Sequence, residues 1–134
     1  MKGRVLAAGT AAARALVLRE PLSLWGGMDP ATGELIDAHH PQRGVSMAGR
    51  VVVMAAVRGS SSASSVLAEA VRAGCAPAAF LLGETDLILA VGAAVAEELY
   101  GMRVPVVVLP PGQLAQIRDD ALLRVDEDGS VTPI

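Results

Sequence analysis

The chain has 134 residues and a formal net charge of −3, and 52% of its residues are hydrophobic. This length suits one domain of ordinary size, and the composition is too apolar for a disordered chain. The sequence has no basic run and only one Trp, one Tyr and one Phe to stack on bases, which argues against nucleic-acid binding. The uncharged run 87–96 is too short to span a bilayer, which takes about 20 apolar residues. Residues 1–14 are typical of a strand and turn rather than a signal peptide, so we expect a cytoplasmic protein with no membrane partner.

The first half of the chain is rich in predicted strands, of which 3–7 and 14–20 come first. The turn signal Asp29–Gly33 predicts a hairpin between two short strands, because its proline fixes one dihedral angle and its glycine tolerates positive φ. A loop rich in Pro and Gly follows at 38–49. The unbroken apolar run 50–56 predicts a central strand that is covered on both faces.

The second half alternates strands and helices, which predicts parallel strands with right-handed crossovers. Residues 63–73 carry apolar side chains at helical spacing and end at Gly74, a typical C-terminal cap. Asp86 is a favourable N-cap for a second helix over 87–100, which is apolar almost all round and which we expect to be buried or docked. The other predicted elements are strands at 77–82, 104–109, 122–125 and 130–132, a short helix at 111–117 and a hairpin turn at 126–129. Together these elements predict one compact α/β domain over residues 1–134.

Five serines lie in RGSSSASSV, residues 58–66, between the central strand and the first predicted helix. A strand-to-helix turn leaves backbone N–H groups unpaired, and the helix dipole adds partial positive charge there. The simplest interpretation is that Ser61 or Ser62 only caps the helix. A second interpretation is an anion site, at which hydroxyls, N–H groups and Arg58 converge on a phosphate or carboxylate.

Three familiar site types do not fit this turn. No Gly-Lys-Ser or Gly-Lys-Thr follows, so a nucleotide P-loop is not indicated. Ser62 stands where the elbow Gly-x-Ser-x-Gly has its second glycine, so a self-contained serine hydrolase is not favoured. A phosphohistidine carrier needs a histidine within such a turn, and His39 and His40 lie elsewhere. The positive potential nevertheless favours the alkoxide of a serine, which makes it a usable proton acceptor if a partner supplies the Lewis acid.

Four blocks of the sequence carry a resemblance to a known family. They are EPLSLWGGMDPATGELIDAHHPQRGVSMAGRVVVM, RGSSSASSVLAEAVRAGCAPAAF, ILAVGAAVAEELYG and PVVVL. In this order they resemble the small subunit, or swivel domain, of aconitase X. The resemblance covers nearly the whole chain. It implies a swivelling β/β/α domain like the C-terminal domain of aconitase, and a hydro-lyase that dehydrates a hydroxy acid.

The resemblance also implies a division of roles. The larger subunit is expected to carry an iron–sulfur or iron centre that accepts the leaving hydroxyl, so we expect no metal or cofactor on this chain. The small subunit closes over the site and supplies a serine from a Gly-Ser-Ser motif. Matched here, Ser60 is the expected catalytic base, which removes the proton from the carbon next to the carboxyl group. Arg58, Gly59, Ser61 and Ser62 are the expected substrate-binding residues of the same turn.

Two positions depart from the family pattern. In aconitase proper an arginine follows the two serines and grips a substrate carboxylate, and Ser62 stands in its place, which argues against citrate-type substrates. Aconitase X small subunits usually have glycine where this chain has Val57, and a β-branched residue tolerates positive φ poorly. Val57 therefore favours the alternative of a non-catalytic swivel or interaction module.

The remaining residues of the resembling blocks have less defined roles. Trp25–Asp29 and His39–Pro41 lie in predicted loops, where they line the site or the subunit interface, or are structural. We expect the turn at Asp29 to be structural and His39 to be solvated, and we keep His40 as a candidate for substrate binding or the interface. Cys75, the only cysteine, is expected to be a small buried side chain after the helix. It is not favoured as a cluster ligand, because one thiolate cannot hold a cluster.

The resemblance thus implies the small subunit of a heterodimeric aconitase X hydro-lyase, inactive without its large subunit. The substrate classes of the family are cis-3-hydroxy-L-proline and mevalonate 5-phosphate. The segments WGGMDPATGE and RGSSSASSVLAEA look more like bacterial members and favour the first. The alternatives are a mevalonate 5-phosphate dehydratase small subunit and a module kept only for assembly or anion binding.

Overall fold

Seven short strands form a single mixed sheet in the computed structural model, which describes all of residues 1–134. The strands are Arg4–Ala7 (β1), Ala11–Val17 (β2), Val51–Met54 (β3), Ala79–Leu82 (β4), Val106–Val108 (β5), Leu122–Val125 (β6) and Val131–Pro133 (β7). Their order across the sheet is β1-β5-β4-β3-β2-β6-β7. The four central strands, β5 to β2 in this order, run parallel as predicted, and β1, β6 and β7 are antiparallel to their neighbours.

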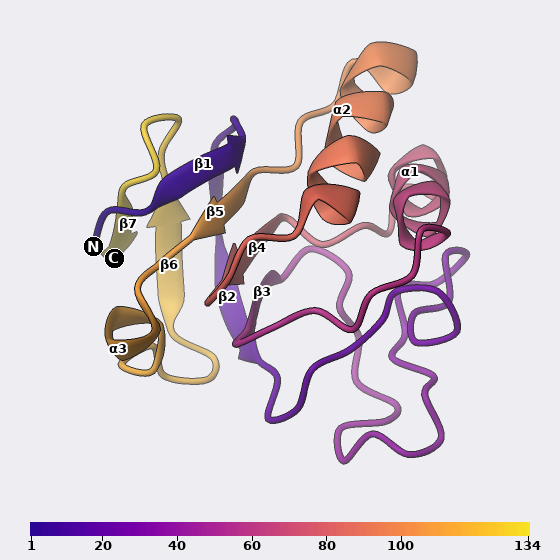
Figure 1. Cartoon of the computed structure of the whole chain (residues 1–134), viewed down its shortest axis with the longest axis horizontal. Helices are drawn as coiled ribbons and strands as arrows, with labels where there is room; N and C mark the ends of the chain where they lie inside the picture. Colours follow the sequence, from indigo (N-terminus) through magenta and orange to yellow (C-terminus); the bar gives the residue numbers. More distant parts are fainter.

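The sheet curls until its two outer edges meet. The N–H of Gly3 donates to the carbonyl of Gly129 at 2.9 Å, and the N–H of Val131 donates to the carbonyl of Met1 at 2.7 Å. These bonds join the β1 edge to the β7 edge, so the first and last residues lie side by side at one end of the molecule (Figure 1).

Two helices, α1 (Ala63–Ala73) and α2 (Leu87–Tyr100), lie side by side at the other end of the molecule (Figure 1). Gly92 allows their close approach, because a Cβ on it would lie 3.0 Å from the Cα and carbonyl oxygen of Ser64. Gly74 ends α1 in the left-handed conformation, as the sequence predicted. The short helix α3 (Pro111–Leu114) lies apart from this pair, and it ends three residues earlier than expected.

The central strand β3 separates two hydrophobic cores. Successive side chains of a strand point to opposite faces of the sheet. Val51 and Val53 belong to a core of 12 residues inside the curled sheet, and Val52 and Met54 belong to a core of 20 residues beneath α1 and α2. All four side chains are buried, which confirms a central strand covered on both faces. The strand is shorter than the predicted run 50–56, because it ends at Met54 and Ala55 is exposed.

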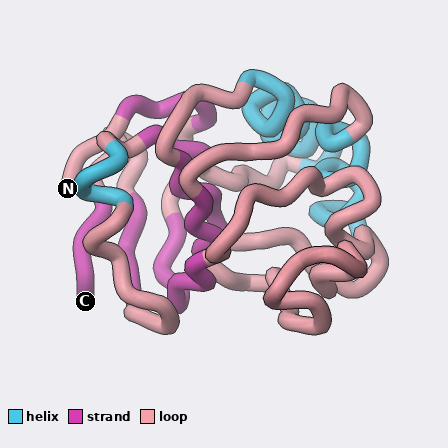
Figure 2. Tube along the Cα trace, turned by 60° about the horizontal axis from the view of Figure 1, so that its bottom comes forward, coloured by secondary structure: helices cyan, strands magenta, loops and turns pink.

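Residues 18–50 form no regular strand, although a hairpin was predicted around Asp29. The reversal itself is present: the Asp29 N–H donates to the Glu34 carbonyl at 2.9 Å, and Met28 and Leu35 form an isolated antiparallel bridge. The pairing stops there because the segment is pinned by buried apolar side chains instead, those of Leu22, Leu24, Met28, Leu35 and Met47. Long loops of this kind crowd the side of the molecule that carries the helices (Figure 2).

Strand β2 covers residues 11–17 rather than the predicted 14–20. Its first residues, AAAR, have little intrinsic preference for a strand, but Ala11–Arg14 pair with β6. The partner strand therefore sets this boundary, and sequence periodicity does not reveal it. None of the helices has the length and apolar character that crossing a bilayer requires.

Candidate active site

The serine turn, residues 55–62, follows β3 and leads into α1. Because β2, β3 and β4 are parallel, the segments that follow them leave the same edge of the sheet. Ligand sites of α/β sheets commonly lie outside the carboxyl ends of the strands. The topology therefore places the serine turn where such a site is expected.

The start of α1 is left open by its own side chains. Ser62 is the N-cap residue, as predicted, but its backbone is helical and its side chain makes no capping hydrogen bond. The hydroxyls of Ser64 and Ser65 donate to carbonyls of the turn at 3.0 and 2.8 Å, so they turn back onto the backbone. The N–H groups of Ser64 and Ser65 have no hydrogen-bond partner within the chain. These free donors and the helix dipole favour negative charge at this point.

Ser60 holds its hydroxyl at the entrance of the turn. Its Oγ accepts a hydrogen bond from the Ser62 N–H at 3.3 Å, and its carbonyl accepts one from the Ala63 N–H at 3.0 Å. A hydroxyl that accepts from a backbone N–H has its own proton free to point elsewhere. The local geometry therefore suits an oxygen that gives up its proton and accepts another.

A hollow of about 660 Å³ opens in front of the serine turn. It brings the turn together with a part of the chain that lies far from it in sequence. One of its walls is apolar, that of Trp25, and the others are glycine or polar side chains. The lining residues are Ser23, Trp25, Gly26, Asp37, Arg58, Gly59, Ser60 and Ser61.

Two opposite charges line this hollow without contacting each other. Arg58 is exposed and forms no ion pair with any carboxylate of the chain. Asp37 is half-buried, and its Oδ1 accepts a hydrogen bond from the His39 N–H at 2.9 Å. A second cavity, of about 290 Å³, is mainly apolar and has Glu84 as its single ionisable residue. The hollow at the serine turn is therefore the better candidate for an active site.

Val57 does not need the conformational freedom of glycine. Asp120 is the only residue other than glycine with positive φ, so Val57 has an ordinary backbone conformation. Its side chain packs against the core beneath the helices, and its backbone forms an isolated parallel bridge with Leu22. Valine at this position therefore does not strain the backbone of the turn. Gly59 also lacks positive φ, and a Cβ on it would meet no atom within 4 Å.

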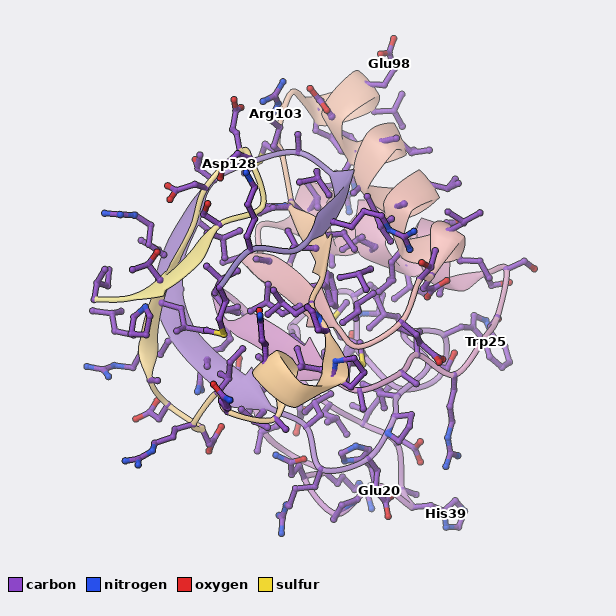
Figure 3. The ribbon with its side chains drawn as sticks, turned by 60° about the vertical axis from the view of Figure 1, so that its left-hand side comes forward. Glu20, Trp25, His39, Glu98, Arg103 and Asp128 are labelled. Atoms are coloured by element: carbon purple, nitrogen blue, oxygen red, sulfur yellow. The ribbon has the colours of Figure 1, made fainter.

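The two histidines have different environments. His39 is exposed and solvated, as predicted (Figure 3). His40 is only 5% exposed, and its ring nitrogens contact the backbone on both sides. Nδ1 accepts from the Gln42 N–H at 3.1 Å, and Nε2 lies 3.0 Å from the Glu20 carbonyl, which requires the proton on Nε2. His40 is therefore a component of the loop, and it is not among the lining residues of the hollow.

The structure brings together most of the predicted site residues. Arg58, Gly59, Ser60 and Ser61 line the hollow, whereas Ser62 lies behind them at the start of α1. Asp37 and Ser23 are additional lining residues that the sequence did not single out. The Oγ of Ser23 is buried without a hydrogen-bond partner. No motif marks these two positions, because they reach the turn only through the folding of residues 18–50.

The chain offers no set of ligands for a metal ion. No three side chains of His, Cys, Asp or Glu come together in a suitable group. Cys75 is half-buried against the core, and its thiol donates to the Pro30 carbonyl at 3.1 Å. Burial raises the pKa of this thiol, and the nearby Asp29 carboxylate raises the pKa further. Asp29 itself accepts a hydrogen bond from the Ala31 N–H at 2.9 Å, which confirms its structural role in the turn.

The sequence profile described as Aconitase X swivel domain matches residues 1–133. The chain belongs to this family. A solved structure of the family, Thermococcus kodakaraensis aconitase X in its holo-form, superposes with a TM-score of 0.87 at 33% identity, covering 99% of this chain and 96% of that one. The resemblance found in the sequence and the swivel-domain fold are both confirmed.

Curated relatives of the swivel domain are of two lengths. Cis-3-hydroxy-L-proline dehydratase of Pseudomonas aeruginosa is 49% identical over 106 residues, which is 79% of this chain and 18% of that protein. The phosphomevalonate dehydratase small subunit of Thermococcus onnurineus is 36% identical over 128 residues, 95% of this chain and 98% of that subunit. The chain thus spans about a fifth of the length of the first relative and nearly all of the second.

Proposed function

We propose that this chain is the swivel component of an aconitase X-type hydro-lyase that dehydrates cis-3-hydroxy-L-proline, with Ser60 as the general base. The observation that carries the proposal is the open serine turn. Ser60 faces a polar hollow at the start of an uncapped helix, beside an unpaired Arg58. The N–H groups of Ser64 and Ser65, which a side-chain cap would occupy, stay free.

The reaction is an elimination of water, and this chain supplies the base that removes the proton. Ser60 Oγ takes the proton from the carbon next to the carboxylate, and the electron pair of that C–H bond becomes the new C=C bond. The hydroxyl on the neighbouring carbon leaves with the electron pair of its C–O bond. The helix dipole, the free N–H groups and Arg58 stabilise the Ser60 alkoxide and the negative charge that develops on the carboxylate.

We assign the acceptor of the leaving hydroxyl to a partner, and the lack of a cluster of His, Cys, Asp or Glu side chains on this chain supports that assignment. We propose that a larger catalytic part supplies it, as a separate large subunit or as the remainder of a longer chain. An iron–sulfur or iron centre there would act as the Lewis acid for the hydroxyl. A lone cysteine and no disulfide fit the reducing cytoplasm, where we place the enzyme.

The surface beside the serine turn supports a larger partner. The outer face of α2 leaves Leu87, Val91 and Leu99 exposed, at 65%, 53% and 64% of their surface. This face continues into the serine turn, because Leu87 and Val91 share a small cavity with Ser61 and Ser64. Contiguous exposed apolar surface is typical of an interaction site. A partner seated here would close over the hollow.

The two candidate substrates differ in charge. The higher identity to cis-3-hydroxy-L-proline dehydratase supports hydroxyproline. The alternative, mevalonate 5-phosphate, is supported by the small subunits that match this chain over nearly their full length. A non-catalytic module is the remaining alternative, and the ordinary backbone of Val57 removes the argument in its favour.

The decisive experiment uses this chain assembled with its catalytic part under anaerobic conditions. Loss of water is followed from cis-3-hydroxy-L-proline and from mevalonate 5-phosphate side by side, for wild type and Ser60→Ala. We expect turnover of hydroxyproline that Ser60→Ala nearly abolishes while assembly is kept. Equal turnover by wild type and Ser60→Ala would show that the serine is not the base, and turnover of the phosphate ester alone would assign the other substrate.

A further inference from the structure

We propose that Asp37 selects a substrate that carries an ammonium group, so that the hollow binds a zwitterion between Asp37 and Arg58. This inference rests on the proposed function and deepens it, because it names the residue that distinguishes an amino acid from a substrate with negative charges only. Neither the motif of the serine turn nor the comparisons with relatives assign a role to Asp37.

The charges of the hollow are balanced but unpaired. Asp37 and Arg58 are the only charged residues among those that line it. They do not form an ion pair, so no nitrogen of Arg58 lies within 4.0 Å of the Asp37 carboxylate. A cation and an anion that face one space without touching are complementary to a ligand that carries both charges. A free α-amino acid is such a ligand, since its carboxylate and ammonium groups are joined by one carbon.

The Asp37 carboxylate is held ready for a ligand. Its Oδ1 accepts from the His39 N–H at 2.9 Å, and its carbonyl accepts from the His40 N–H at 3.2 Å. His40 is buried and hydrogen-bonded to the backbone of Glu20 and Gln42. The segment that follows Asp37 is therefore held in place. Oδ2 makes no hydrogen bond within the chain. One carboxylate oxygen therefore orients the group, and the other stays available to an ammonium N–H.

Trp25 completes the fit for a ring amine. It is the single apolar residue of the lining and is 61% exposed, and it projects outward at this side of the molecule (Figure 3). An indole ring attracts both methylene groups and a cation placed over its face. The ammonium group and ring carbons of a cyclic amino acid match the pair of Asp37 and Trp25.

The same carboxylate disfavours the competing substrate. Mevalonate 5-phosphate carries a carboxylate and a phosphate and no cationic group. Binding it here would place a second anion in a space that has one arginine and one aspartate. Like charges in proximity reject a wrong ligand, and charge complementarity favours the right one. Asp37 thus favours the binding of a zwitterion and disfavours the binding of mevalonate 5-phosphate.

The test compares Asp37→Asn with wild type in the assembled dehydratase. Asparagine keeps an oxygen that can accept from the His39 N–H, and it replaces the second carboxylate oxygen with an uncharged NH2 group that cannot accept from an ammonium. We expect the KM for cis-3-hydroxy-L-proline to rise by about tenfold or more, which is the effect of losing one charge-assisted hydrogen bond, while kcat changes by less than about threefold. Glu34→Gln is the matched control, because Glu34 is an exposed carboxylate of the same segment that does not line the hollow.

Binding measurements separate this inference from the proposed function. The affinities of L-proline and of cyclopentanecarboxylate, which lacks the nitrogen, are measured by calorimetry on the assembled enzyme. We expect wild type to prefer L-proline by about tenfold or more and Asp37→Asn to lose that preference. This ratio does not depend on turnover or on the folded fraction of a variant, and Asp37→Ser serves if Asp37→Asn does not fold.

The outcomes are distinct. Absence of hydroxyproline turnover in wild type, with the preference for L-proline present and dependent on Asp37, would refute the proposed reaction and keep the zwitterion site. Turnover of hydroxyproline with KM and preference unchanged in Asp37→Asn would refute the role of Asp37 and keep the proposed reaction. A wild type that binds both ring compounds equally would also overturn the inference.

Discussion

The two long helices start at neighbouring turns of the same sheet edge, and they start in opposite ways. At α2, Asp86 has an extended backbone and accepts from the Ile88 N–H at 3.0 Å, so its carboxylate closes the helix. At α1, Ser62 has a helical backbone and its side chain caps nothing. The chain therefore closes the start of α2 with a side-chain cap and leaves N–H donors free at the start of α1, next to the hollow.

This difference explains the serine run better than capping does. Serine is among the best N-cap residues, and a cap contributes about 1 kcal/mol to stability. Three serines, at positions 60–62, precede α1, and the fold does not use the side chain of the N-cap residue Ser62 as a cap. The prediction of a side-chain cap by Ser61 or Ser62 was therefore wrong in its hydrogen bond and right in the position of Ser62. The N–H groups of Ser64 and Ser65 are therefore available to a ligand.

The largest expected effect tests the open turn directly. Ser60→Ala removes the proposed proton acceptor, and we expect turnover to fall by about 10² to 10⁴-fold, the usual contribution of a general base. Steady-state kinetics of the assembled enzyme measure it. Ser65→Ala is the matched control, because its exposed hydroxyl bonds back to the Ser62 carbonyl. A similar loss of turnover in both variants would mean that the serines act through the fold of the turn.

A second expected effect concerns the loop at His40, where, in contrast to the start of α1, both ring nitrogens have backbone partners. His40→Ala leaves the Glu20 carbonyl and the Gln42 N–H without their partner, so we expect the free energy of unfolding to fall by about 1 to 3 kcal/mol. Denaturant unfolding measures it, with the exposed His39→Ala as control. If His40→Ala instead kept its stability and lost activity, His40 would be a substrate residue, as the sequence left open.

A third effect concerns the entrance to the serine turn. Val57→Gly introduces the glycine that the resemblance to aconitase X implies at this position. It removes a side chain packed on the core and adds backbone freedom. We expect a loss of about 1 to 2 kcal/mol of stability without a gain in turnover. Thermal unfolding and kinetics are measured on the same preparation. A large gain in turnover would show that the family glycine has a catalytic purpose that the backbone conformation does not explain.

The smallest effect separates the two helix starts themselves. Asp86→Ala removes a real cap, and we expect a loss of about 0.5 to 2 kcal/mol. Ser62→Ala removes a side chain that caps nothing, so its effect is expected to stay within about 0.5 kcal/mol. Both are read from denaturant unfolding midpoints. Equal losses would mean that Ser62 caps α1 in solution, and the contrast between the two starts would disappear.

The elements that the sequence predicted well are those with local signals. The apolar run of β3, the terminal glycines of α1 and α2 and the Asp86 cap each depend on a few neighbouring residues. The turn Asp126–Gly129 between β6 and β7 is of the same kind. Such features depend on backbone preferences that act within one or two turns of chain, so they can be predicted without knowledge of the fold.

The parts that were missed depend on distant partners. Ala11–Arg14 become a strand because β6 lies beside them, and the hairpin expected at Asp29 stays irregular because its side chains are anchored in the core. The site shows the same division. Arg58 to Ser61 carry a motif and were predicted, whereas Asp37 reaches the hollow only through the path of a long loop. Such positions have no local sequence signature, because their role depends on residues that are distant in sequence and come close only in the folded chain.

The two chain ends meet at the side of the molecule opposite to α1 and α2 (Figure 1). A peptide attached to either end therefore starts away from the serine turn and does not need to cross the hollow. A domain with this placement of its ends can be a separate chain, or it can be fused to another domain at its N-terminus or at its C-terminus. Affinity tags, fluorophores or a tether to a surface can be added at the same place without obstructing the hollow.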